Sequence, residues 1–239
     1  MFRQKKTQYI EQLNKLNSLI TVIKPSSVIS EEFRTLRTNI QFSMVDKKFT
    51  TLMFTSASPG EGKTTVASNV AVVFASQGKK VLLIDADMRN PSVHQMFNLL
   101  NHSGLTNLLT EDKMNIQDVV HQTRIKNLYV LTCGVIPPNP SELLASNKMD
   151  QLLDNLKEKF DLIIFDLPPI LAVTDAQVMA NKTDGTIFVI RNGVAEKNNL
   201  YKAKELLEHV HANVIGVVYN DKKRSTDTAY HYYGIENEG

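Results

Sequence analysis

Short, unbroken apolar runs alternate with amphipathic stretches along the chain from about residue 49 onward. Unbroken apolar runs are typical of strands buried on both faces, and apolar residues at helical spacing indicate helices between them. This alternation predicts an α/β fold, a mostly parallel sheet with helices on both faces and right-handed crossovers. We expect strands at 49–56, 81–87, 128–133, 162–166, 185–191 and 214–220, and helices at 62–77, 141–159 and 196–210.

Three segments lie outside this pattern. Residues 8–23 have an amphipathic spacing that fits a docking helix or, more simply, a frayed extension. Residues 30–44 are expected to form a helix with Ser30 as its N-cap and with Glu31 and Glu32 in the first turn, where they suit the helix dipole. From Asp221 onward the chain is polar. We therefore divide it into an N-terminal extension (1–29), one α/β domain (30–220) and a flexible tail (221–239).

Composition and charge narrow the function classes. The 239 residues include 27 basic and 25 acidic side chains, a balance that does not favour nucleic acid as a partner. The single cysteine, Cys133, excludes an internal disulfide and is expected to be a small core residue at a strand end. No apolar run approaches the about 18 residues that a membrane span requires. We expect a cytoplasmic protein whose link to the membrane comes from a partner.

The segment 57–64, ASPGEGKT, follows one predicted strand and opens a helix. It matches a phosphate-binding loop, with alanine where the usual pattern has its first glycine. Gly60 and Gly62 allow backbone N–H groups to approach phosphate oxygens at the positive end of the helix dipole. Lys63 would hold the β- and γ-phosphates, and Thr64 would offer a hydroxyl to Mg²⁺. The fold is therefore expected to be of the P-loop NTPase type, and nucleotide binding is the strongest inference from the sequence.

Carboxylates follow two further predicted strands. Asp166 ends LIIFD as a Walker B carboxylate, and Asp85 and Asp87 end VLLIDAD, with Arg89 beyond them. The carboxyl ends of strands in an open α/β sheet are where ligands bind, so all three should face the loop. A lone aspartate there is often only a turn former or a helix cap. Three together beside a phosphate-binding loop favour a metal site.

These segments resemble one family, the bacterial tyrosine kinases of capsular and exopolysaccharide biosynthesis. ASPGEGKT is similar to its Walker A motif, LLIDADMRNP to its Walker A′ motif and IIFDLPP to its Walker B motif. GVIPPNPSELLAS (134–146), DLPPILAVTDAQ (166–177) and GVVYN (216–220) also resemble family segments. The similarity runs from about residue 26 to the end of the chain.

The resemblance implies an ATP-dependent protein-tyrosine autokinase that uses Mg²⁺. Asp87 would be the base for the tyrosine hydroxyl, with Lys63 and Asp85 as the other catalytic residues. The metal ligands would be Thr64, Asp85 and Asp166. The nucleotide would contact Ser58, Gly60, Glu61, Gly62, Lys63, Thr64, Thr65 and Asn220. For Asn220, recognition of the adenine amide edge and simple termination of the last strand are equally good interpretations.

The resemblance also implies substrates and partners. Tyr230, Tyr232 and Tyr233 would be phosphorylated, preferably between subunits. Glu31, Arg34 and Arg37 match the family's E-x-x-R-x-x-R oligomerisation pattern, which implies a homo-oligomeric ring. The implied partners are a membrane-anchored activator of the polysaccharide co-polymerase type, a protein-tyrosine phosphatase and other protein substrates, and the implied role is control of polysaccharide synthesis.

Two alternatives come from other function classes. A ParA/MinD-like ATPase, a nucleotide-switched binding module, shares the expected fold, but such proteins resemble one another in carrying lysine where this chain has Ser58. A catalytically silent scaffold that binds nucleotide in order to assemble is the second. His94 and His102 are expected in surface or capping roles, because no ligand spacing links them to Cys133.

Overall fold

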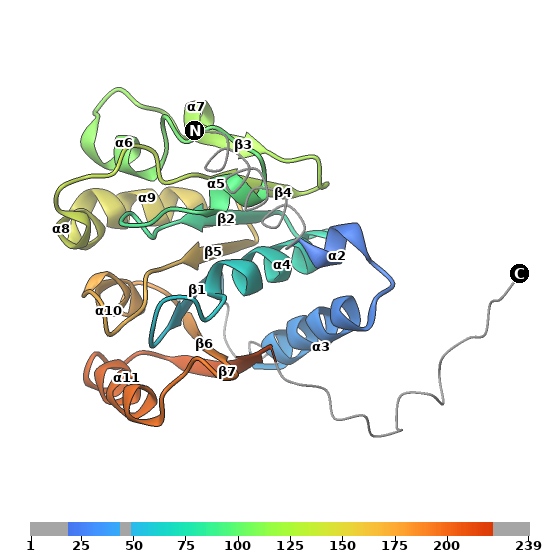
Figure 1. The fold of residues 1–239 in the computed structure, drawn as a ribbon. Helices are drawn as coiled ribbons and strands as arrows, with labels where there is room; N and C mark the ends of the chain where they lie inside the picture. The colour runs from blue at the N-terminus through green and yellow to red at the C-terminus, as the bar shows by residue number, and fades with distance from the viewer. Residues whose placement is uncertain (1–18, 44–48, 222–239) are drawn as a thin grey trace, which may run out of the picture.

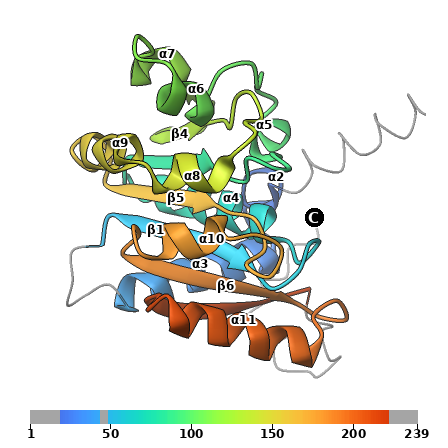
Figure 2. The ribbon, with the colours of Figure 1, turned by 90° about the vertical axis from the view of Figure 1, so that its left-hand side faces the viewer.

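A seven-stranded sheet with helices on both faces forms the centre of the molecule (Figures 1 and 2). The structure is a computed structural model that describes residues 19–43 and 49–221. The strand order is β3-β4-β2-β5-β1-β6-β7, and every neighbouring pair is parallel except β3 and β4. This confirms the predicted mostly parallel sheet. The strands are β1 (Thr51–Ser56), β2 (Val81–Asp85), β3 (Val120–Gln122), β4 (Leu128–Leu131), β5 (Leu162–Asp166), β6 (Gly185–Arg191) and β7 (Val214–Asn220).

An apolar core lies on each face of the sheet. One core packs the sheet against α3 and α4, and the other packs it against α8, α9, α10 and α11, the helices nearest the viewer in Figure 2. The helices are α2 (Ile20–Ile23), α3 (Val28–Ser43), α4 (Lys63–Ala75), α5 (Val93–Met96), α6 (Leu105–Thr110), α7 (Ile116–Val119), α8 (Pro140–Ala145), α9 (Asn147–Lys157), α10 (Asp175–Ala180) and α11 (Lys197–His209).

The buried middle of this fold fixes the position of the phosphate-binding loop. Strands β1, β2 and β5 are buried at every residue, as their unbroken apolar runs predict. Helix α4 is buried from Val66 to Ala75, because it lies against the centre of the sheet. The loop between β1 and α4 therefore sits at the carboxyl edge of the sheet, beside the ends of β2 and β5.

Helix α3 begins two residues earlier than expected, and Ser30 is not its N-cap. Ser30 is buried within the helix, where its hydroxyl donates to the carbonyl of Lys24 over 2.7 Å. That carbonyl lies at the end of α2, so the hydroxyl ties the two helices together instead of capping one of them. The prediction failed because a serine before an apolar periodic run has the same local sequence signature in either role.

The structure also divides one predicted helix in two and adds an edge strand that was not predicted. The segment 141–159 forms two helices, α8 and α9, because Ser146 is extended and its hydroxyl caps α9 by accepting from the N–H of Met149. Strand β3 was not predicted, since three residues on an antiparallel edge leave no periodic signal.

The amphipathic stretch 8–23 is described only from residue 19. Leu19 is buried, and Thr21 in α2 bonds through its N–H and its hydroxyl to the side-chain oxygen of Asn69 in α4. This end of the stretch therefore packs on the helix that follows the phosphate-binding loop. Its earlier residues lie outside the described part of the chain.

Candidate active site

The phosphate-binding loop has the backbone that its sequence predicts. Gly60 and Gly62 have φ angles of +81° and +88°, a left-handed conformation that side chains disfavour. Gly62 precedes the first residue of α4, and a Cβ atom there would lie 2.2 Å from the side-chain nitrogen of Asn220. The glycine is thus required twice, for the turn and for the close approach of β7. The loop amides and the thirteen-residue helix behind them form an anion site.

The side chain of Glu61 points into the protein and shapes the loop from within. It is fully buried, and its carboxylate accepts from the N–H groups of Ser58 (2.7 Å) and Arg191 (3.2 Å). Asn220 lies on the same loop, where its amide donates to the carbonyl of Glu61 over 3.1 Å. Glu61 therefore contacts two other predicted nucleotide-binding residues, Ser58 and Asn220. Thr65 follows on the first turn of α4.

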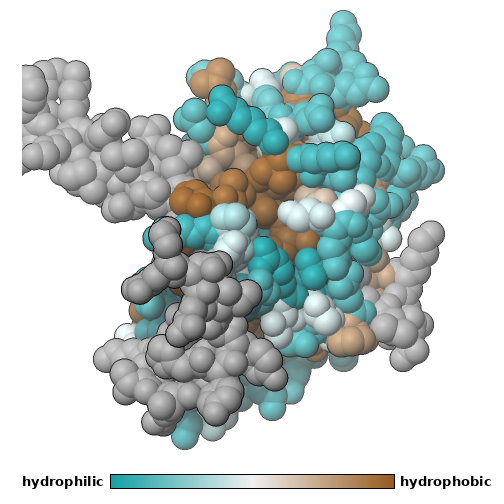
Figure 3. Space-filling view, turned by 90° about the vertical axis from the view of Figure 1, so that its right-hand side faces the viewer, coloured by the Kyte–Doolittle hydropathy of each residue, from teal (hydrophilic) through white to brown (hydrophobic). Residues whose placement is uncertain are grey.

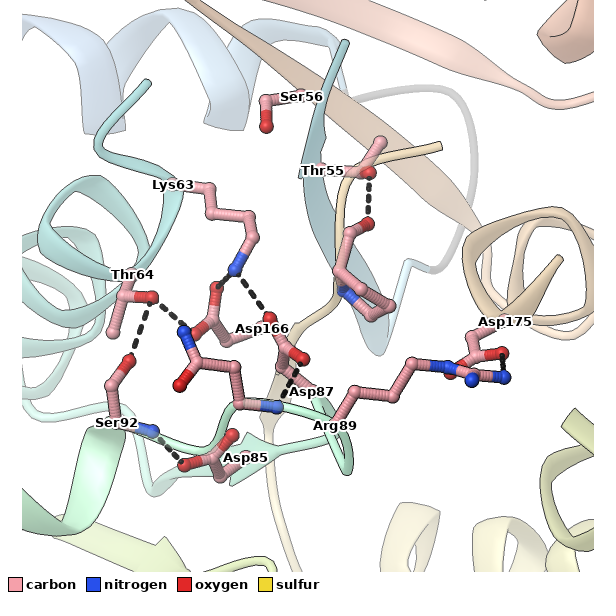
Figure 4. A network of polar contacts seen from close by, with 12 residues as sticks. Thr55, Ser56, Lys63, Thr64, Asp85, Asp87, Arg89, Ser92, Asp166 and Asp175 are labelled. Atoms are coloured by element: carbon pink, nitrogen blue, oxygen red, sulfur yellow. Dashed lines mark hydrogen bonds and ion pairs between the residues drawn. The ribbon is translucent and has the colours of Figure 1, made fainter. Parts of the chain in front are cut away.

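Lys63 and Thr64 bring the loop into contact with two strand ends (Figure 4). The ammonium of Lys63 lies 2.8 Å from Asp87 Oδ2 and 3.9 Å from Asp166 Oδ1. The hydroxyl of Thr64 donates to Asp166 Oδ2 over 2.6 Å. Burial alone would lower the pKa of Lys63, but Asp166 and Asp87 outweigh it and hold the pKa above its ordinary value. Lys63 is therefore a permanent cation between two carboxylates.

The two carboxylate oxygens of Asp85 have different roles: one makes a structural contact and the other faces the site. Its Oδ2 accepts from the N–H groups of Ser92 and Val93, each at 2.9 Å, which caps the start of α5. Its Oδ1 is buried without a hydrogen-bond partner, as is Asp166 Oδ1. The sheet register places these two aspartates side by side. Burial, together with the negative charges of Asp166 and Asp87, raises the pKa of Asp85 well above its usual range, and burial raises the pKa of Asp166.

The donor set at this point fits Mg²⁺. It consists of the Thr64 hydroxyl and two buried carboxylate oxygens without a hydrogen-bond partner, Asp85 Oδ1 and Asp166 Oδ1. Mg²⁺ prefers hard oxygen ligands of this kind. No group of three or more His, Cys, Asp or Glu side chains in 19–43 and 49–221 is arranged to hold a metal unaided. In nucleotide sites, one or two protein carboxylates typically share Mg²⁺ with substrate phosphates and water.

Asp87 lies at the start of the loop that leads from β2 to α5. Its Oδ1 accepts from the N–H of Asn90 over 3.0 Å, its Oδ2 meets Lys63, and only 4% of the residue is exposed. Both carboxylate oxygens are therefore oriented, one by the turn and one by the loop lysine.

The pairing of Arg89 with Asp175 was not predicted from the sequence, although Arg89 was named beside Asp85 and Asp87. Asp175, fully buried at the start of α10, accepts from Arg89 Nε and Nη2, each at 3.1 Å, and from the hydroxyl of Ser141 over 2.9 Å. Figure 4 shows Arg89 extending away from Lys63 toward Asp175. Arg89 and Asp175 both lie in segments that resemble the kinase family, and that resemblance was the only feature of the sequence that pointed to them. The ion pair anchors the Asp87 loop to α8 and α10.

The remaining candidates lie away from this cluster. Cys133 is fully buried after β4, as predicted, and burial raises its pKa to about 12. His94 lies in α5. On α3, Arg34 pairs with Glu31 and donates to the carbonyl of Pro25, and Arg37 donates to the carbonyl of Val73 over 3.2 Å. The three tail tyrosines fall outside the described residues.

Comparison with known proteins gives the family. The AAA domain model matches residues 49–210. The tyrosine-protein kinase YwqD of Bacillus subtilis is 49% identical over 219 residues, 92% of each chain. The putative tyrosine-protein kinase CapB of Staphylococcus aureus is 44% identical over 213 residues, 88% of this chain and 92% of its own.

Solved structures agree with these relatives. The crystal structure of the chimerical protein CapA2B2 superposes with a TM-score of 0.84 at 42% identity, covering 87% of this chain and 91% of the other. The kinase domain of the Escherichia coli tyrosine kinase ETK superposes with a TM-score of 0.82 at 36% identity, covering 90% and 84%. A P-loop, a lysine between two strand-end carboxylates and these relatives together show that the chain belongs to the bacterial tyrosine-protein kinases.

Proposed function

We propose that this chain is an autokinase that transfers the γ-phosphoryl group of ATP to tyrosines of its own C-terminal tail. Residues 30–220 would form the catalytic domain and residues 221–239 the substrate segment. The observation that carries the proposal is the contact of Lys63 with Asp87 and its approach to Asp166, which joins a phosphate-binding loop to two carboxylates.

The loop would hold the triphosphate. Backbone N–H groups from Gly60 to Thr65 would face its oxygens, and Lys63 would neutralise the charge that develops on the transferred group. Asn220 lies on the loop next to Gly62, so it can close the nucleotide site from the β7 side. Glu61, with its carboxylate turned inward, would act by holding the loop in shape.

Thr64, Asp166 and Asp85 would hold Mg²⁺. When bound, Mg²⁺ neutralises charge on the β- and γ-phosphate oxygens. The carboxylates supply the negative charge that makes the site selective for a cation, and burial from water strengthens that attraction.

Asp87 would accept the tyrosine proton. A tyrosine hydroxyl has an unperturbed pKa of about 10, so it needs a nearby base as its oxygen bonds to phosphorus. During transfer the tyrosine oxygen would bond to the γ-phosphorus, and the bond from that phosphorus to the bridging oxygen would break, so that ADP leaves. The tyrosine proton would move to the Asp87 carboxylate. The bonds of Asp87 to Asn90 and Lys63 orient that carboxylate before substrate arrives.

The tail contains the preferred substrates, Tyr230, Tyr232 and Tyr233. From Asn220 to Tyr230 the chain can span about 33 to 36 Å when fully extended, which is enough to enter a neighbour's site. We propose transfer between subunits of a ring, with Glu31, Arg34 and Arg37 at the interface. Phosphates of about −1.5 to −2 charges each would then repel one another and the acidic site, which would release the tail.

A mixture of two variants tests this proposal. One chain is Lys63→Met with intact tyrosines, and the other is active with all three tail tyrosines changed to Phe. Label from ATP on the Lys63→Met chain supports transfer between subunits. Wild-type chains that label normally, beside an unlabelled Lys63→Met chain, would refute it.

The wider role follows from the resemblance to polysaccharide-synthesis kinases. We propose regulation of capsule or exopolysaccharide synthesis from the cytoplasmic side of the membrane, through a membrane-anchored activator and with a phosphatase and further protein substrates. No helix within 19–43 or 49–221 has the length and apolarity needed to cross a membrane. Transfer measured with and without the activator's cytoplasmic segment tests the partner.

A further inference from the structure

Arg191, at the end of β6, connects the phosphate-binding loop with Asp221, the first residue of the tail. Its Nη1 donates to the carbonyl of Gly60 over 3.1 Å. Its Nε and Nη2 donate to the carboxylate of Asp221 over 3.1 and 3.0 Å. Its backbone N–H donates to buried Glu61. One arginine therefore contacts the loop twice and the start of the tail twice.

The chain turns at the point where Arg191 holds it. Asp221 has a φ angle of +56°, a left-handed conformation that aspartate tolerates better than most residues. Just before it, the carbonyl of Asn220 accepts from the N–H of Asn192 over 3.0 Å, and the Asn220 side chain bonds to the loop. Residues 220 and 221 are thus held beside the loop by backbone and side-chain hydrogen bonds.

We propose that Arg191 is a positioning residue for self-phosphorylation, which acts through Asp221 to set the path of the tyrosine tail. This inference rests on the proposed autokinase function and adds a residue pair to it. The pair does not touch the reacting atoms. It stabilises one exit direction of the tail, and that raises the fraction of time in which a tail is presented to a site.

The size of the effect follows from the exposure of the pair. The side chains are 42% and 61% exposed, so water and salt screen the attraction. Exposed pairs stabilise by about 0.2 to 1 kcal/mol, which corresponds to a change of about 1.4- to 5-fold in a population. Loss of the pair should therefore slow tail labelling by up to about fivefold, without abolishing it.

The test places the changes in the acceptor chain alone. The acceptor is full-length Lys63→Met with intact tyrosines, and the donor is the active chain with its three tail tyrosines changed to Phe. Asp221→Asn, Arg191→Gln and their combination are introduced into the acceptor. Asparagine tolerates the left-handed conformation, so this change removes the charge and keeps the turn. Glu208→Ala, which removes the exposed Lys204–Glu208 pair of α11, is the matched control.

A second arm tests the donor. Asp221→Asn is introduced into the donor, and a free peptide of residues 225–239 is the acceptor. We expect the KM for ATP and the rate on the peptide to stay unchanged. Each single acceptor variant should label about 1.4- to 5-fold more slowly, and the double variant no more slowly than either single variant.

Three results would overturn the inference: acceptor labelling that equals the Glu208→Ala control, single effects that multiply in the double variant, or peptide phosphorylation that falls in parallel with tail labelling. The last would mean that the pair serves the phosphate-binding loop. Absence of label from wild-type chains and from the peptide alike would instead count against the autokinase function itself.

Discussion

Removing the ion pair between Arg89 and Asp175 would test how the loop that carries Asp87 is held in place. Arg89 follows Asp87 by two residues and makes two parallel bonds to a carboxylate that is fully buried. The hydrogen bond to Asp175 is the main reason that the pKa of Arg89 lies above its ordinary value. Arg89→Ala should therefore weaken the fold and displace the predicted base.

The magnitude lies between two limits. Exposed pairs contribute at most about 1 kcal/mol, and breaking a fully buried pair costs about 3 to 5 kcal/mol. Asp175 is buried, while the Arg89 side chain is 42% exposed, and Ser141 still donates to the carboxylate after the change. We expect a loss of about 2 kcal/mol in the free energy of unfolding. For a chain of this size that is about 4 to 8 °C in Tm.

Calorimetric unfolding and kinase assays would measure the two consequences. Arg89→Lys keeps the charge but loses the planar fork, so it should fall between wild type and Arg89→Ala. Misplacement of the base should lower kcat about tenfold or more, with the KM for ATP little changed. Arg124→Ala, at an exposed arginine, is the control. A Tm for Arg89→Ala within 1 °C of that control, or an unchanged kcat, would refute the argument.

The remaining predictions concern the site, α3 and Cys133. Lys63→Met should abolish transfer and weaken ATP binding, whereas Asp87→Asn should lower transfer and leave nucleotide affinity nearly intact. If calorimetry shows that Asp87, Asp85 and Asp166 variants lose Mg-ATP affinity equally, the role of Asp87 as the base loses its support. Arg34→Ala with Arg37→Ala should convert a species larger than a dimer into monomer by sedimentation, and a monomeric wild type would count against the ring. The raised pKa of Cys133, about 12, should leave the native thiol unreactive toward iodoacetamide at pH 8. Because the native thiol keeps its proton while an unfolded thiol loses it, unfolding stability should fall between about pH 9 and about pH 12, as a Cys133→Ser variant compared in urea would show.

The sheet and the loop could be predicted because each has a local cause. Unbroken apolar runs mark strands such as β2 and β5, which are buried on both faces. Gly60 and Gly62 mark a backbone that other residues disfavour. Once the strands are parallel, Asp85 and Asp166 must emerge at one edge, so their proximity follows from topology alone.

The missed contacts depend on distances between segments far apart in the chain. Arg89 and Asp175 are 86 residues apart, and the sequence around neither residue indicates that the two side chains pair. Ser30 was assigned as a cap from its neighbours, although its hydroxyl serves a carbonyl six residues earlier. The inward turn of Glu61 was equally hidden, because its partner Arg191 comes from β6. Sequence thus locates the groups that perform the chemistry, and tertiary packing decides what holds them in place.

The fold by itself does not separate a kinase from a nucleotide-switched ATPase. Any such sheet places a phosphate-binding loop beside strand-end carboxylates, and a carboxylate can deprotonate water as well as a tyrosine. A kinase is distinguished from an ATPase by the acceptor that reaches the Asp87 carboxylate. Asp87 is only 4% exposed, so the access of that acceptor is restricted. In the proposed autokinase reaction, a tail tyrosine would be present at far higher effective concentration than a free peptide, so tail transfer should outcompete peptide transfer. ATP turnover that needs no tyrosine acceptor would instead favour the ATPase.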